Sequence, residues 1–544
     1  MFFIRLIFLV LSFLICTSAF AGKPQLVLQI TVDQLRGDML PRFQERFGDG
    51  GFRYLLDNGT VYANTWYEHA NTLTAVGHAT LATGGSTPQH GMAANDWYSQ
   101  KLGRKVYCIE DAGAPVIGGE KGELSGRSPR NVTSSTFADE LVLASGGRSR
   151  AFGVSTKDRG AIILPGRQGQ AYWYDRSSGA YVTSTWYRDE YPEWVMNWNA
   201  GKPADRYAGA TWDLLADREG YVYREQDDRE FELPRGTLGG TFPHTMARST
   251  GGRYYSDLRY TPWADELTLS FTQALLEAEQ LGKGENTDYL SVSFSATDYV
   301  GHSFGPNSLE AEDNLLRLDR TLARLFASID KAVGLDKTLI VLSSDHGAQA
   351  APEHLEIHGF EAGRLGTEDL LEPIDKALSA HYGVAESLVA AFVKPNLYLD
   401  LDALARAGID LEDAETALAG IVVELPGFSH AFTRSDLLEG DLADTAVSRA
   451  VLNAFHPVRS GNVYVVAAPH WYFGHAMNSD AATHGTLYSP DTFVPMVFAG
   501  PGIENKVVGR RVSPRDLAPT LSAYMGILPP TGSVGQVLEE IANR

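Results

Sequence analysis

The sequence predicts an α/β fold in which helices sandwich a largely parallel central sheet. Short, β-rich apolar runs recur along the chain, at residues 26–32, 151–155, 289–295 and 338–342. Segments with helical periodicity lie between them, such as the one after residue 307, where apolar residues recur every three or four positions. This alternation is typical of parallel strands joined by helices.

Each of these predicted strands runs into a chemically capable side chain. The first leads to Asp33, the second to Lys157, the third to Asp298, and the fourth to Asp345 and His346. Because the carboxyl ends of parallel strands meet at one edge of a sheet, and binding sites form there, we expect these side chains to lie close together.

The helices between the strands carry recognisable start signals. Asn307 and Glu310 have the spacing of a capping box before a long amphipathic helix. Thr261 followed by Pro262 predicts another helix, with threonine as the N-cap and proline in the first turn. A further helix is expected over residues 515–525.

We expect an interrupted core. Residues 96–255 are rich in Tyr, Trp, Gly and Asp, which suggests loops above the sheet, and residues 350–480 combine two helical patterns with short strands. The predicted organisation is a signal peptide at 1–21, a first core part at 22–349 with a loop-rich excursion at about 96–255, an inserted cap at 350–480, and a final core part at 481–544.

The N-terminus is typical of a secretory signal peptide. Arg5 supplies the positive charge, residues 6–15 are apolar, and Ala19-Phe20-Ala21 is a small-x-small cleavage site. The apolar run is too short to span a bilayer, which takes about 20 residues, and no later stretch qualifies. We therefore expect cleavage after Ala21 and a periplasmic or secreted protein.

Composition excludes several classes of partner. Hydrophobic residues make up 44% of the 544 residues, so a core of ordinary size can form, but the net charge is −21. Such a chain has no general affinity for nucleic acid or anionic membranes, and any anion site must be a local concentration of metal and basic groups.

After cleavage Cys108 is the one cysteine left, so no internal disulfide forms. We expect a monomer.

Six side chains have the chemistry of catalytic metal ligands. Carboxylates and imidazoles without thiolates suit zinc in a catalytic site, and six such groups are enough for two ions with open positions. Taken singly, an aspartate at a strand end is commonly a loop cap, and a His-Gly pair is commonly a turn. The six are Asp33, Asp298, His302, Asp345, His346 and His484.

Thr74 is the candidate nucleophile. Small residues follow it as far as Thr80, so a helix can begin there, and a helix N-terminus favours an anion. Coordination to zinc lowers the pKa of a hydroxyl further and gives a nucleophile near neutral pH. Without the metal ligands, Thr74 would be interpreted as an N-cap.

Together these motifs resemble the alkaline phosphatase superfamily, and most closely its threonine-nucleophile, PafA-type alkaline phosphatases. The matching segments are Asp33, Thr74 to Thr80, Asp298-x-x-x-His302, Asp345-His346-Gly347 and Thr483-His484-Gly485. The resemblance implies an alkaline phosphatase-like core with two zinc ions. It implies that Asp298, His302 and His484 hold one ion, and that Asp33, Asp345 and His346 hold the other together with Thr74.

Three more residues match that subgroup, where the corresponding positions bind phosphate. Arg159 can form two parallel hydrogen bonds to phosphate oxygens, Lys157 adds a compact charge, and Asn95 can donate an amide hydrogen bond. Alone, Lys157 and Arg159 would be a solvated surface pair. In this family the lysine takes the place of a magnesium ion.

The expected activity is hydrolysis of small phosphate monoesters through a phosphothreonine intermediate. The alternative within the superfamily is a phosphodiesterase or nucleotide pyrophosphatase, and a different class is a non-catalytic binding protein on the same fold. A sulfatase fits this chain less well, because the chain has no Cys-x-Pro-x-Arg or Ser-x-Pro-x-Arg segment from which a formylglycine nucleophile could be made.

Overall fold

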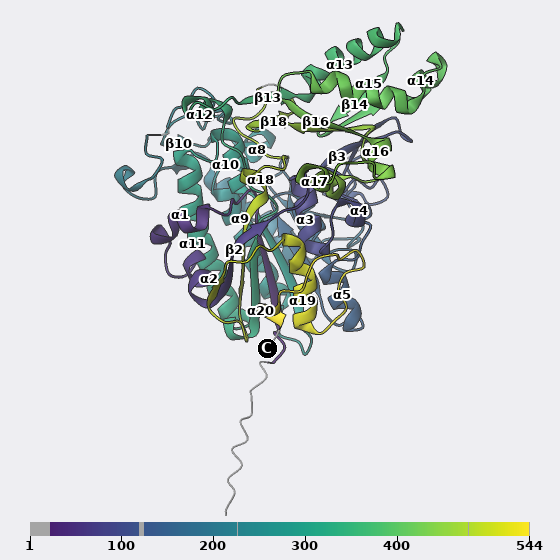
Figure 1. Ribbon diagram of the computed structural model, residues 1–544. Coiled ribbons are helices and arrows are strands. Elements are labelled where there is room, and N and C mark those ends of the chain that lie inside the picture. Colours follow the sequence, from purple (N-terminus) through teal and green to yellow (C-terminus); the bar gives the residue numbers. More distant parts are fainter. Residues whose placement is uncertain (1–21, 119–123, 226, 477, 543–544) are drawn as a thin grey trace, which may run out of the picture.

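A ten-stranded sheet forms the centre of the part of the chain that the computed structural model describes, which is residues 22–542 without 119–123, 226 and 477 (Figure 1). The predicted signal peptide lies outside the described residues. The strand order is β20-β2-β19-β12-β1-β11-β6-β7-β8-β5. The strands are β1 (Leu26–Val32), β2 (Gly59–Trp66), β5 (Val116–Ile117), β6 (Ala151–Ser155), β7 (Gln170–Tyr174), β8 (Tyr181–Ser184), β11 (Asp288–Phe294), β12 (Thr338–Ser343), β19 (Phe493–Ala499) and β20 (Lys506–Val508).

The middle of this sheet is parallel. Strands β12, β1, β11, β6 and β7 all run the same way, whereas β19 is antiparallel to both of its neighbours and β8 is antiparallel to β7. Strands β1, β11 and β12 are buried along their whole length, which explains their nearly continuous apolar sequences. The predicted fold class is confirmed, and all four predicted strands are present.

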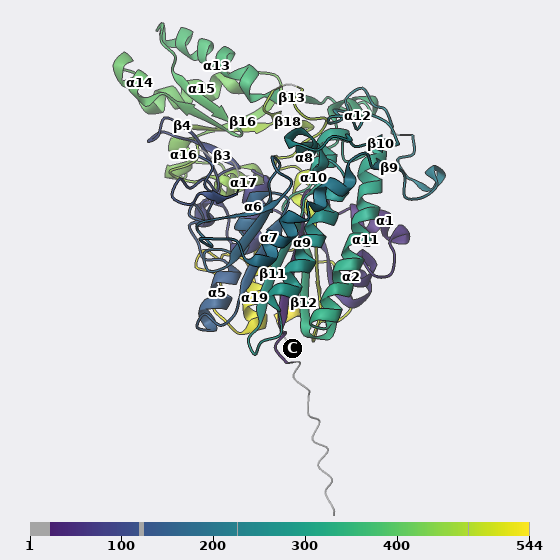
Figure 2. The same ribbon diagram turned by 180° about the vertical axis from the view of Figure 1, so that it is seen from behind.

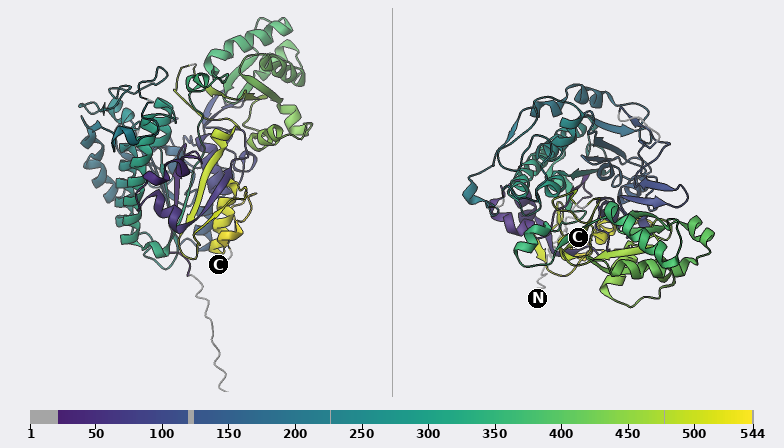
Figure 3. Two further views of the ribbon diagram at one scale, coloured as in Figure 1. Left: turned by 60° about the vertical axis from the view of Figure 1, so that its left-hand side comes forward. Right: turned by 90° about the horizontal axis from the view of Figure 1, so that it is seen from above.

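Helices pack on both faces of the sheet. Alternate side chains of β1 point to opposite faces, so Leu28 and Ile30 enter one hydrophobic cluster and Val27 enters another. The first cluster includes α9 (Trp263–Glu279) and α11 (Leu309–Ala332), and the second includes α3 (Thr74–Thr83), α5 (Phe137–Ala144) and α19 (Leu517–Met525). In the left view of Figure 3 the teal helices and yellow α19 stand on opposite sides of the sheet.

Two predicted helix starts are wrong by one residue each. Ser308, not Asn307, is the N-cap of α11, and its hydroxyl accepts a hydrogen bond from the Ala311 amide at 3.1 Å. Helix α9 begins at Trp263, and the Thr261 hydroxyl donates backwards to the Leu258 carbonyl at 2.7 Å. At α9 the Thr261 hydroxyl is already bonded to the Leu258 carbonyl, and at α11 Ser308, one residue after Asn307, has the hydroxyl that reaches the Ala311 amide.

A smaller layer, here called the cap, lies beyond one edge of the main sheet (Figures 1 and 2). It has a four-stranded sheet of order β14-β15-β17-β16 and its own hydrophobic cluster. Its elements fall within the expected range 350–480. They are β13 (Gly363–Gly366), α13 (Thr367–Tyr382), β14 (Val389–Val393), β15 (Asn396–Leu399), α14 (Leu401–Ala407), α15 (Leu411–Val423), β16 (Phe428–Thr433), α16 (Arg434–Glu439), α17 (Ala446–Ala454), β17 (Val463–Ala467) and β18 (Trp471–Gly474).

Residues 96–255 contain four strands of the main sheet (β5 to β8) as well as long loops. Their other elements are β3 (Asp96–Ser99), β4 (Arg104–Tyr107), α6 (Asp158–Ile162), α7 (Glu193–Ala200), β9 (Thr211–Trp212), β10 (His244–Thr245) and the start of α8 (Gly252–Leu258). The remaining helices are α1 (Met39–Phe43), α2 (Phe52–Asn58), α4 (Thr87–His90), α10 (Ala296–Phe304), α12 (Pro352–Ile357), α18 (Ser489–Thr492) and α20 (Glu539–Ala542). Among the described residues, no helix is both long and apolar enough to cross a membrane.

Candidate functional site

The structure brings the six predicted metal ligands together at the carboxyl edge of the parallel strands. They form two groups, and within each group the donor atoms all lie within 4.8 Å of one another. One group is Asp298, His302 and His484, and the other is Asp33, Asp345 and His346. Four separate parts of the chain supply them, namely the end of β1, helix α10, the loop after β12 and the loop before β19.

In the first group, Asp298 and His302 lie one helical turn apart on α10 and so face the same way. Asp298 Oδ1 lies 3.2 Å from His302 Nε2 and 3.5 Å from His484 Nε2. The Nδ1 atom of His302 is 2.9 Å from the Ala482 carbonyl, and that of His484 is 2.7 Å from the Thr72 carbonyl. A carbonyl only accepts, so each Nδ1 carries the proton and each Nε2 lone pair points into the group, as in metal-binding histidines.

The second group repeats this arrangement. His346 Nδ1 donates to the Gly347 carbonyl at 2.9 Å, and its Nε2 lies 3.5 Å from Asp33 Oδ1 and 3.4 Å from Asp345 Oδ2. The rings of His346 and His484 stack with centroids 3.5 Å apart, which joins the two groups into one site.

The buried oxygens in this site fit a divalent cation. Both Asp33 oxygens and Asp345 Oδ2 are inaccessible to water and accept no hydrogen bond of good geometry from the described residues. The Lys157 ammonium lies 2.6 Å from Asp33 Oδ2 and 2.5 Å from Asp298 Oδ2, so it pairs with two of the three buried carboxylates of the site. Buried charges need compensation, and oxygen and nitrogen donors without sulfur suit zinc or a similar ion.

Burial sets the ionisation of the site. It lowers the pKa of His346 to about 3, an effect that Asp345 opposes and His484 reinforces, and it lowers the pKa of His484 to about 4. These imidazoles are therefore neutral at neutral pH, which is the form that binds metal. Burial alone would lower the pKa of Lys157, but the carboxylates of Asp298 and Asp33 outweigh it and hold that pKa above its usual value.

Thr74 is the first residue of α3 and is fully buried at the meeting point of these groups. Its hydroxyl oxygen lies 3.5 Å from His346 Nε2 and accepts a hydrogen bond from Arg159 Nη2 at 3.2 Å. The N-cap of α3 is Leu73, whose own side chain makes no capping hydrogen bond. The N-cap interpretation of Thr74 is therefore wrong, and its hydroxyl faces the site.

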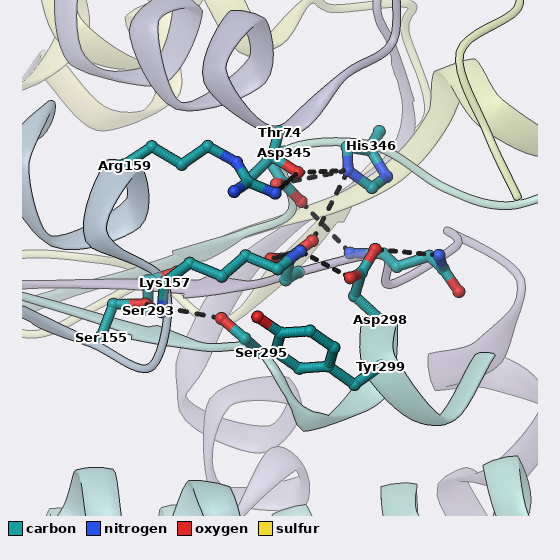
Figure 4. Close-up of polar contacts among 12 residues, drawn as sticks. Thr74, Ser155, Lys157, Arg159, Ser293, Ser295, Asp298, Tyr299, Asp345 and His346 are labelled. Carbon is teal, nitrogen blue, oxygen red and sulfur yellow. Dashed lines mark hydrogen bonds and ion pairs between the residues drawn. The ribbon is translucent and has the colours of Figure 1, made fainter. Parts of the chain in front are cut away.

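The three predicted phosphate-binding residues contact different parts of the site. Figure 4 shows the Arg159 guanidinium directed at Thr74 and the Lys157 ammonium directed at Asp298. The Ala75 amide donates to Asn95 Oδ1 at 2.9 Å, which leaves the amide nitrogen of Asn95 available to another acceptor. Arg159 and Asn95 therefore lie beside the candidate nucleophile, and Lys157 lies between Asp33 and Asp298 of the two donor groups.

Two supporting residues were not found from the sequence. Gln34 donates to Asp298 Oδ1 at 3.0 Å through its side chain and to Asp345 Oδ1 at 3.2 Å through its backbone amide. The sequence signal that could have identified Gln34 is its position directly after Asp33. The Tyr107 hydroxyl accepts from Arg159 Nη1 at 3.2 Å and so fixes the guanidinium. No local pattern marks Tyr107, because its contact depends on how β4 packs.

Gly77 allows α3 to pack closely against the loop that holds Asp345. A Cβ atom at Gly77 would lie 1.9 Å from the Asp345 carbonyl oxygen, so we expect Gly77→Ala to lower the free energy of unfolding by about 3 kcal/mol and to displace Asp345. Urea unfolding and metal content would measure the two effects. The control is Gly420→Ala in α15, where a Cβ meets nothing within 4 Å and helix propensity favours alanine by about 1 kcal/mol. Equal stability of both variants would contradict the packing argument.

Most of this chain matches the model of one known protein family. The family model for type I phosphodiesterase / nucleotide pyrophosphatase matches residues 27–487. The chain belongs to this family. Family members similar over nearly the whole chain include alkaline phosphatase PafA of Elizabethkingia meningoseptica, 33% identical over 96% of this chain and 95% of the relative. Alkaline phosphatase PhoV of Synechococcus elongatus is 33% identical over 99% of both chains.

Solved structures of proteins with this fold superpose on the chain over almost its whole length. The crystal structure of wild-type PafA superposes with a TM-score of 0.90 at 32% identity, over 96% of this chain and 99% of that one. Murine ectonucleotide pyrophosphatase/phosphodiesterase 5 superposes with a TM-score of 0.53 at 14% identity, over 92% of this chain and 95% of that one, which shows a shared fold. The resemblance to PafA-type alkaline phosphatases that the motifs predicted is confirmed.

Proposed function

We propose that this chain is an exported, zinc-dependent alkaline phosphatase that hydrolyses small phosphate monoesters through a phosphothreonine formed at Thr74. Its full-length similarity to alkaline phosphatases supports the class of phosphoric monoester hydrolase. The observation that carries the proposal is the position of the Thr74 hydroxyl, between two metal-type donor groups and an arginine that donates to it.

Asp298, His302 and His484 would hold one zinc ion, and Asp33, Asp345 and His346 would hold the other together with Thr74. Bound zinc would supply Lewis acidity to the nucleophile and to the leaving oxygen. The Thr74 hydroxyl releases its proton to solvent water and its oxygen forms the new bond to phosphorus. The ester bond on the opposite side breaks, and the leaving oxygen takes a proton from water and departs as the alcohol. Water then cleaves the phosphothreonine.

The chain's own side chains stabilise charge on the transferring phosphoryl group. Arg159, fixed by Tyr107, can donate to two non-bridging oxygens, and Asn95, whose Oδ1 is occupied by the Ala75 amide, presents its NH₂ group. Lys157 is held charged between Asp33 and Asp298, so it contributes positive charge without a mobile proton. Such preorganised groups are the main source of rate acceleration in phosphoryl transfer.

Removal of metal is expected to abolish activity while the fold remains. The purified protein should contain about two zinc ions per chain, and dialysis against a chelator should reduce hydrolysis of 4-nitrophenyl phosphate to background, with recovery on adding Zn²⁺. Metal analysis by mass spectrometry, run beside the assay, measures both. Full activity in a metal-free sample would overturn the proposal.

Two further expectations can be tested on the purified protein. Size-exclusion chromatography would test the expected monomer, and the N-terminal sequence after expression with the leader would test cleavage after Ala21.

The second candidate is a phosphodiesterase, because the matching family model carries that name. A diester has one negative charge and needs fewer donors than a monoester, whereas this site gathers Lys157, Arg159 and Asn95. Turnover of a monoester and a diester by the same preparation would decide between the two functions.

A further inference from the structure

A cavity of about 450 Å³ connects the candidate active site to the cap. On one side it is lined by Asn95, Arg159, His302 and His484. On the other it is lined by residues 390–394, which form the end of β14 and the residue after it. The cap therefore contributes a wall to the space beside the phosphate-binding groups.

This cavity lies on the side from which the leaving group would depart. A second cavity, of about 510 Å³, also touches Lys157 and Arg159, but its described lining contains neither His302 nor His484. In-line attack by Thr74 places the ester oxygen opposite the nucleophile, and the proposed function assigns that oxygen to the Asp298, His302 and His484 group. The alcohol part of the substrate would therefore extend towards β14.

Lys394 is a partly buried positive charge on this wall. Its ammonium donates to the Phe473 carbonyl at 3.0 Å, and no described carboxylate lies within 4.0 Å of it. An ammonium has three donors, so two remain for another acceptor. Lys394 lines the same cavity as His302 and His484 of the first donor group. Burial lowers the pKa of Lys394, and the negative charges of Asp480 and Asp298 oppose that shift.

The same cavity also has three acidic side chains, Asp96, Glu368 and Asp480. Asp480 Oδ1 lies 3.8 Å from His302 Nδ1, and Glu368 is exposed at the rim, where water screens it. The wall beside Lys394 is apolar, with Phe392 and Val393 buried. It can pack against the carbon atoms of a small alcohol.

We propose that Lys394 is a specificity-determining residue that binds a second anionic group on the alcohol part of the substrate. The favoured substrates are then phosphate monoesters of small hydroxy acids, whose carboxylate reaches the Lys394 ammonium while the phosphate lies on Arg159 and Asn95. This inference rests on the proposed function and names the substrate class of the same site.

The test compares 3-phosphoglycerate with glycerol 3-phosphate, which differ by a carboxylate in place of a hydroxymethyl group. We expect the wild-type enzyme to prefer 3-phosphoglycerate in kcat/KM by about 10-fold or more, the effect of one hydrogen bond to a charged group. Lys394→Met should remove that preference, mainly through KM, and leave 4-nitrophenyl phosphate turnover within about 3-fold. The control variant Lys105→Met, which removes an exposed charge from the same cavity, should keep the preference for 3-phosphoglycerate.

Three outcomes would overturn the inference. The wild-type enzyme could show no preference for 3-phosphoglycerate over glycerol 3-phosphate, or Lys394→Met could keep that preference unchanged. A preference of the wild-type enzyme for phosphoethanolamine would instead assign the cavity to a cationic alcohol. If Lys394→Met fails to fold, inhibition of the wild-type enzyme by glycerate against glycerol decides, with glycerate expected to bind at least about 10-fold more tightly. Absence of turnover of 4-nitrophenyl phosphate by the wild-type enzyme would instead refute the proposed function.

Discussion

Replacing Thr74 with alanine is expected to lower kcat for 4-nitrophenyl phosphate by at least about 10³-fold, because the variant has no atom that can form the covalent intermediate. Metal content should stay at the wild-type level, since all six carboxylate and imidazole donors remain. Steady-state kinetics and metal analysis on one preparation would measure both effects. Acid quenching of the wild-type enzyme during turnover, followed by mass spectrometry, should find phosphate on the peptide that contains Thr74.

Two controls separate chemistry from packing. Thr74→Ser keeps a hydroxyl and should retain substantial turnover. Thr80→Ala removes a buried hydroxyl from the same helix, where it lies 3.4 Å from His90, and should change kcat by less than about 3-fold. Turnover by Thr74→Ala at the wild-type rate would remove Thr74 from the mechanism.

Replacing Arg159 with alanine is expected to discriminate between esters. For a monoester such as phenyl phosphate, kcat/KM should fall by about 10²-fold or more, because two charge-assisted hydrogen bonds to non-bridging oxygens are lost. For a diester such as methyl phenyl phosphate, which carries less charge on those oxygens, the loss should stay below about 5-fold. Parallel measurements of kcat/KM for the two esters give the ratio.

The matched control is Arg150→Ala. Arg150 directly precedes β6 of the same sheet, and its guanidinium lies 2.7 Å from Asp288 Oδ2, at the opposite end of the sheet, where β11 begins. Its removal should leave the monoester-to-diester ratio unchanged. Equal losses for both esters in Arg159→Ala would contradict the assignment of Arg159 to the doubly charged phosphate and would favour the diesterase function.

The boundaries of α11 show what a local sequence pattern can and cannot predict. The periodicity of α11 predicted a long helix with one apolar face, because burial at three- and four-residue steps is a property of the helix itself. Its first residue was predicted wrongly, because Asn307 and Ser308 can both cap and it is the Ser308 hydroxyl that reaches the Ala311 amide. Local rules therefore predict that an element exists more securely than where it begins.

The sequence alone determined the fold class and four strands of the sheet, and it placed Asp33, Asp345 and His346 at strand ends, because strand periodicity and parallel connection bring strand ends to one edge. Its motifs determined the family. Asp298, also expected at a strand end, lies on α10. Only the tertiary structure decided which distant side chains touch. The contact of Lys157 with both Asp33 and Asp298, the support of Arg159 by Tyr107, and the approach of Lys394 to the site all join separate elements. Their distances follow from how loops and the cap pack, and no local pattern encodes that packing.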